Sequence, residues 1–169
     1  QQVIYFTTTD SDNNGNSADG RGRVYVLNLA TGAVQLAADN ATGDMATKLA
    51  VGASWSNPDN LAIDAKGNIY VIEDQDGGKA DIWFIRDIND DGIADEVGKW
   101  ASLSTTGAEP TGLYFDPFDP NVAYVNVQHP SSGDDMLIRI SAVPEPGSIA
   151  LLLGTIGVLG GTMRRRKAN

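Results

Sequence analysis

The stretch Asn57–Asp64, which reads NPDNLAID and is followed by a turn and Ile69–Ile72 (IYVI), decides the fold of this chain because it occurs twice. The second copy is Glu109–Asp116 (EPTGLYFD), a turn, and Ala123–Asn126 (AYVN). Ile4–Phe6 (IYF) fits the place of the second run one unit earlier. Each copy joins two short runs rich in β-branched and aromatic residues, a pattern that indicates an antiparallel hairpin.

We interpret these copies as blades of a β-propeller, because repeats of roughly 40–50 residues with about four short strands each are typical of that fold. Residues 3–38 would hold strands B, C and D of a first blade, 58–103 a whole second blade, and 110–141 strands A, B and C of a third. The sequence thus predicts an all-β fold, a partial β-propeller of about two and a half blades in residues 1–141. A β-sandwich of about ten strands is the alternative. The strands are expected at Val3–Thr8, Arg23–Leu29, Ala33–Ala37, Asn60–Asp64, Asn68–Glu73, Asp81–Arg86, Val97–Ser102, Gly112–Asp116, Val122–Gln128 and Met136–Ser141, with residues 41–55 as a loop containing at most one helical turn.

The composition fits an exported protein rich in turns. Gly, Asn, Asp, Thr and Ser are abundant, whereas Lys and Glu are scarce. Without Glu145 and the four cations of residues 164–167, the chain has 21 acidic and 8 basic residues, which argues against a nucleic-acid partner. No cysteine is present, so disulfides and thiolate metal sites are excluded for these residues. Because the chain starts at Gln1 without a signal peptide, we expect it to be the C-terminal part of a longer exported protein.

Acidic residues gather at one predicted face of the propeller. Residues before strand A and after strand B would share the mouth near the central axis, and this places Asp59, Asn60, Glu73, Asp74 and Glu109 together. Crowded carboxylates resist burial unless a cation compensates them, and oxygen ligands with one histidine favour Ca²⁺ over zinc. The alternative is that each is an ordinary turn residue or solvated strand end. Gln75, Gln128, His129, Asp10, Asp12 and Asp19 would lie at the same mouth.

A loop on the opposite face reproduces the start of an EF-hand. Its side chains alternate as D-x-N-x-D-G, which is the spacing that turns oxygen ligands inward around calcium. Position 12 is Gly98 rather than Glu, and strands flank the loop, so a structural calcium site and a plain hairpin remain equal alternatives. The candidate ligands are Asp87, Asn89, Asp91 and Asp95, and a weaker version of the pattern contains Asp10 and Asp12.

The segments 58–61, 67–74, 109–117 and 125–130 resemble the C-terminal blades of PhoX-type alkaline phosphatases, and the ending Asn126-Val127-Gln128-His129-Pro130 is the most specific part. The resemblance covers residues 3–140. It implies a secreted propeller with a calcium and iron cluster at its mouth that polarises a phosphomonoester.

By position, the resemblance makes Asp59, Asp74 and Glu109 metal ligands. Asn60 stands where the family more often has Gly, and Pro110 follows Glu109 where the family has Val. The resemblance places the family's iron thiolate upstream of this chain, so iron would be held partly by residues that are not in it.

The C-terminal residues 142–169 resemble the PEP-CTERM sorting signal of exopolysaccharide-producing Gram-negative bacteria. Pro144, Glu145 and Pro146 precede about 17 apolar residues, and Arg164, Arg165 and Arg166 follow them. The apolar run predicts a single helix that crosses the inner membrane with its basic end in the cytoplasm. The resemblance implies cleavage by an exosortase and release to the periplasm or cell surface. An ordinary membrane anchor is the alternative.

Three functions are compatible with these patterns. The leading hypothesis is an exported PhoX-like phosphomonoesterase in which metals act as Lewis acids on the phosphoryl oxygens. The second is a non-catalytic, calcium-stabilised propeller that binds exopolysaccharide or surface proteins of the biofilm matrix. The third is a gluconolactonase-like hydrolase that uses one calcium at the propeller mouth.

Overall fold

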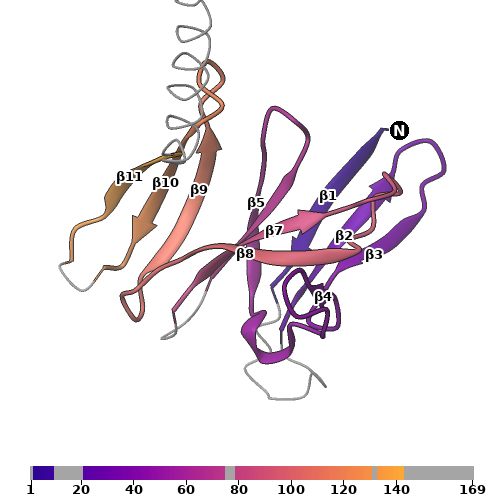
Figure 1. The fold of residues 1–169 in the computed structure, drawn as a ribbon, viewed down its shortest axis with the longest axis horizontal. Coiled ribbons are helices and arrows are strands. Elements are labelled where there is room, and N and C mark those ends of the chain that lie inside the picture. Colours follow the sequence, from indigo (N-terminus) through magenta and orange to yellow (C-terminus); the bar gives the residue numbers. More distant parts are fainter. Residues whose placement is uncertain (1, 10–20, 75–78, 131–132, 143–169) are drawn as a thin grey trace, which may run out of the picture.

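The computed structural model describes residues 2–9, 21–74, 79–130 and 133–142, and within them the protein is all-β. Three sheets follow one another along the chain, and all their strand pairs are antiparallel except β4–β8 (Figure 1). The first has the order β1-β2-β3, the central one β4-β8-β7-β6-β5 and the last β11-β10-β9. The bounds are β1 Val3–Thr8, β2 Arg23–Asn28, β3 Val34–Ala38, β4 Gly43–Asp44, β5 Pro58–Ile63, β6 Ile69–Glu73, β7 Asp81–Arg86, β8 Glu96–Ser102, β9 Glu109–Phe115, β10 Val122–Gln128 and β11 Met136–Ser141.

All ten expected strands are present, with some bounds shifted and one short strand added. β5 and β9 each begin earlier than expected, so Asp59 and Glu109 lie inside strands rather than before them. The loop of residues 41–55 contains the expected single turn, a 3₁₀ helix at Gly52–Ser54. It also contributes β4, which pairs in parallel with β8 and was not anticipated because two residues are too few to give a periodic signal.

The central sheet is buried on both faces. Its strand β6 is buried at all five positions, which explains why it reads as a continuous apolar run rather than an alternating one. Ile69 and Val71 face the first sheet, where they pack with Trp55, Trp83 and residues of β2. Tyr70 and Ile72 face the last sheet and pack with residues of β9 and β10. Each sheet therefore packs face to face on the next.

The three sheets do not close into a barrel within the described residues (Figure 1). No helix of the described residues is long and apolar enough to cross a membrane. The helix expected over residues 147–163 lies outside the described residues, as does the whole sorting segment from residue 143 onward.

Candidate metal-binding site

The pairing of strands brings the two copies of the repeat to one edge. Pro58 at the start of β5 pairs with Glu73 at the end of β6, and Glu109 at the start of β9 pairs with Gln128 at the end of β10. β5 and β9 are also neighbours. Figure 1 shows that β10 ends where β9 begins, at the lower side of the view. The shared edge predicted from the sequence is therefore present.

Glu109 is the residue through which the two sheets meet at this edge. The carboxyl group of Asp74, which follows β6, lies near that of Glu109. The Gln128 amide Nε2 donates to Glu109 Oε2 over 2.7 Å, and His129 Nε2 lies 3.8 Å from the same oxygen. Burial raises the pKa of Glu109, and the Asp74 carboxylate beside it adds to the rise. Two carboxylates from neighbouring sheets thus lie close together. A bound cation would relieve their mutual repulsion.

Asp59 has a different neighbourhood. Its side chain is exposed, and its Oδ2 accepts a hydrogen bond of 2.5 Å from Asn60 Nδ2. Asn60 Oδ1 in turn accepts from Thr111 Oγ1 over 2.7 Å and from the backbone N–H of Gly112 over 3.3 Å. Asn60 therefore connects β5 to β9 and orients Asp59. The sequence missed this role of Thr111, because only the packing of the two sheets brings it within reach.

Glu73 lies in the interior rather than at the mouth. Its side chain is 1% exposed, and its oxygens accept N–H groups from Ser56, Asp81 and the Trp83 indole. Burial raises the pKa of Glu73 to about 7, against the lowering effect of those donors. Sequence reasoning placed Glu73 among the metal ligands. In the structure both oxygens accept N–H groups of the protein, and metal binding by Glu73 stays a prediction.

The profile of the alkaline phosphatase PhoX family matches residues 1–131, and that of the PEP-CTERM protein-sorting motif matches residues 142–167. The chain belongs to the PhoX family. No curated protein and no solved structure matches the chain significantly. Together the two matches show an exported PhoX-like protein that carries a signal for exosortase-type processing, as the sequence predicted.

The PhoX family is metal-dependent, so the described residues can be tested for their fit to a cation. The paired carboxylates of Asp74 and Glu109 fit a hard cation, which prefers oxygen ligands. Within the described residues, no group of three or more His, Cys, Asp or Glu side chains is arranged to hold a metal ion. The structure therefore brings Asp74 and Glu109 together, whereas Asp59 is turned to Asn60.

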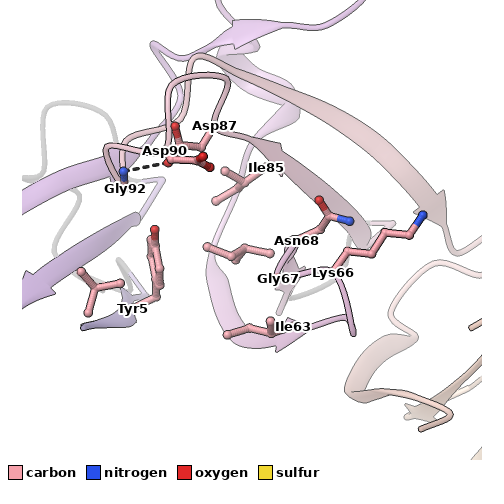
Figure 2. Close-up of a pocket in the computed structure, with 11 residues that line it drawn as sticks. Tyr5, Ile63, Lys66, Gly67, Asn68, Ile85, Asp87, Asp90 and Gly92 are labelled. Atoms are coloured by element: carbon pink, nitrogen blue, oxygen red, sulfur yellow. Dashed lines mark hydrogen bonds between the residues drawn. The ribbon is translucent and has the colours of Figure 1, made fainter. Parts of the chain in front are cut away.

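The Asp87–Asp95 loop follows β7 at the opposite end of the central sheet from this edge, and it borders a pocket of about 430 Å³ (Figure 2). Asp87 Oδ2 accepts the N–H of Gly92 over 2.7 Å, and Asn89 Oδ1 accepts that of Asp91 over 3.1 Å. Asp95 Oδ2 accepts the N–H of Ile88 over 2.7 Å. The loop side chains thus satisfy the loop backbone, and calcium binding here stays a prediction. Asp10 and Asp12, together with Asp19 and Gln75, lie outside the described residues.

Proposed function

We propose that this chain is the C-terminal part of an exported, surface-sorted, metal-dependent phosphomonoesterase. The observation that supports the proposal most directly is the proximity of Asp74 and Glu109, which come from two neighbouring sheets of a PhoX-family chain. A structural role would not require two carboxylates to meet at a sheet edge, because a neutral pair would pack there without repulsion.

Asp74 and Glu109 would hold the metal, and Asp59 would join them from β5. A bound cation would supply Lewis-acid polarisation of the phosphoryl oxygens. Gln128 holds one oxygen of Glu109, so the other oxygen and the Asp74 carboxylate remain to face a ligand. His129 lies 68% exposed beside Glu109, where its imidazole can contact a substrate from the solvent side. We propose calcium as the cation, with iron held through residues upstream.

We further propose that the three sheets are consecutive blades of a β-propeller. The support is that neighbouring sheets pack face to face and that the central and last sheets share the repeated hairpin, β5–β6 in one and β9–β10 in the other. β1 is an edge strand among the described residues, although its repeat equivalent β6 is flanked on both sides. A strand pairing with β1 and a further sheet packing on the first one would complete this arrangement.

The sorting segment gives the location in two steps. We propose that residues 147–163 cross the inner membrane as a helix until an exosortase cuts near Pro144, Glu145 and Pro146. The mature C-terminal peptide from the native host is then expected to end near Glu145 and Pro146 in mass spectrometry. Recovery of an intact terminus with residues 164–169 from the cell surface would contradict cleavage and support a plain membrane anchor.

The enzymatic proposal is tested with the full-length protein and a chromogenic phosphomonoester. We expect hydrolysis with calcium present and loss of activity after EDTA, restored by added calcium. Asp74→Asn and Glu109→Gln are each expected to lower kcat/KM by at least about 100-fold, since each would remove a ligand. Asp116→Asn, which changes a carboxylate in the β9–β10 turn at the opposite end of the sheet, serves as the matched control. Full activity of the metal-free protein would contradict the proposal.

A second function is supported by the hydrogen bond between Asn60 and Asp59, which occupies a carboxylate that the phosphatase proposal needs. In this alternative the chain is a non-catalytic propeller that binds exopolysaccharide or matrix proteins. Full-length protein that retains a labelled exopolysaccharide from its own host, and hydrolyses no phosphomonoester under any metal condition, would favour this alternative.

A further inference from the structure

Glu73 is the most deeply buried carboxylate of the described residues, and its surroundings explain why it is tolerated there. Oε1 accepts the backbone N–H of Ser56 over 2.8 Å and the indole N–H of Trp83 over 2.7 Å. Oε2 accepts the backbone N–H of Asp81 over 3.0 Å. These three donors come from two segments, the entry to β5 with Ser56 and the strand β7 with Asp81 and Trp83. One side chain therefore ties together the end of the central sheet that lies next to the candidate site.

The backbone hydrogen bonds between β5 and β6 are incomplete where Pro58 pairs with Glu73. Pro58 pairs with Glu73 but has no N–H to donate, and the register shifts between Pro58 and Asn60. The backbone ladder is therefore interrupted one residue before Asp74. The Glu73 side chain takes the N–H of Ser56 instead, and the N–H of Asp74 donates to the carbonyl oxygen of Asn57 over 2.9 Å.

These two hydrogen bonds lie side by side and fix the same two dipeptides. Ser56-Asn57, just before β5, is held by Glu73-Asp74 at the end of β6, first through a side chain and then through the backbone. Asn57 adopts a left-handed backbone conformation with φ 42°, which asparagine tolerates better than most other non-glycine residues. The Glu73 carboxylate holds Ser56, the residue before Asn57, by accepting its backbone N–H.

We propose that Glu73 is a positioning residue that directs the Asp74 carboxylate toward Glu109 by anchoring the Ser56-Asn57 segment to which the Asp74 backbone is bonded. The inference rests on the proposed function in one respect, namely that Asp74 and Glu109 hold the metal. In this proposal Glu73 is not itself a metal ligand, because its side chain is 1% exposed and its oxygens already accept three N–H groups of the protein. Sequence position alone would have assigned it the opposite role.

The test is Glu73→Gln in the full-length protein. In either orientation of the new amide, an NH₂ group faces at least one of the three N–H donors, so the anchor is lost although the side-chain size is kept. We expect the affinity for Ca²⁺, measured by titration calorimetry, to fall about 10- to 100-fold, as is typical when a group that orients a ligand is removed. Crystal structures of both proteins grown without added metal are expected to show the Asp74–Glu109 contact only with Glu73 present.

Two further variants separate positioning from general stability. Val97→Ala opens a cavity at a fully buried position of β8, opposite Ile85 and on the turn side of the sheet, and is expected to lower stability while leaving Ca²⁺ affinity unchanged. Glu73→Asp keeps the charge but is one methylene shorter, and replaces Glu73→Gln if that variant does not fold. We expect the affinity to fall for Glu73→Asp as well.

The inference is overturned if Glu73→Gln loses stability as Val97→Ala does while its Ca²⁺ affinity and the Asp74–Glu109 contact are unchanged. Failure of the proposed function has a different signature. If the wild-type protein neither binds Ca²⁺ nor hydrolyses a phosphomonoester, the phosphatase proposal falls, and the crystal structures alone decide whether Glu73 sets the position of Asp74.

Discussion

Burial of Tyr70 makes the stability of the folded chain depend on pH in the alkaline range. Its ring packs against Phe84, Trp100 and Phe115, and its hydroxyl lies 3.4 Å from Asp64 Oδ2. Burial, with a further contribution from the Asp64 carboxylate, raises the pKa of Tyr70 to about 12. The folded state therefore keeps the phenolic proton at a pH where the unfolded chain has begun to lose it.

The sign of the resulting pH dependence follows from linkage. The stability associated with the Tyr70 proton is complete below the unfolded pKa of about 10 and is lost as pH rises toward 12. At pH 11 the loss is about 1.4 kcal/mol. Tyr70→Phe has no phenolic proton and should not show this loss. The difference in free energy of unfolding between the variant and the wild type, measured in urea titrations, should therefore shift in favour of the variant by about 1.4 kcal/mol from pH 8 to pH 11. Tyr114→Phe removes an exposed hydroxyl and controls for the general alkaline effect; an equal improvement there would contradict the assignment.

Between elements, Asn60 provides a polar connection from β5 to β9. Asn60→Ala is expected to lower the free energy of unfolding by about 1–2 kcal/mol, because Thr111 Oγ1 and the N–H of Gly112 lose their acceptor. Thr111→Val should cost less, and the double variant should show a coupling of about 0.5–1.5 kcal/mol in chemical denaturation. Strict additivity of the two single changes would mean that the sheets are held by apolar packing alone.

The same elements show how far the sequence predicts the structure. The hairpins of Asn57–Asp64 and Glu109–Asp116 could be recognised because repeat, turn chemistry and β-branched runs all point to the same pairing. The Asp74–Glu109 contact followed from that pairing. The interior position of Glu73 and the orientation of Asp59 could not be predicted, because they depend on the N–H donors of Ser56 and Trp83 and on the approach of β9.

At the scale of the whole molecule, the first sheet has one face without a partner among the described residues. Ile4 pairs with Leu27, Phe6 with Tyr25, and Tyr25 with Leu36, so these side chains form one apolar surface. Ile4 is 49% exposed and Phe6 37% exposed. Their equivalents in the repeat, Ile69 and Val71, are 7% and 0% exposed because the first sheet covers them. The propeller proposal requires the same cover over Ile4 and Phe6, since exposed apolar surfaces of this kind mark interfaces.

Phe6→Asp in the full-length protein tests this cover. If a preceding sheet packs on Phe6, the substitution places a carboxylate in an apolar interface and should lower the free energy of unfolding by about 3–5 kcal/mol. Phe118→Asp is the matched control, because Phe118 is 95% exposed in the turn between β9 and β10 and should change stability by less than about 0.5 kcal/mol. Thermal unfolding followed by calorimetry gives both values. Equal, small effects of the two substitutions would show that the first sheet keeps an open face in the full-length protein, and the partial propeller would have to be replaced by an open stack of three sheets.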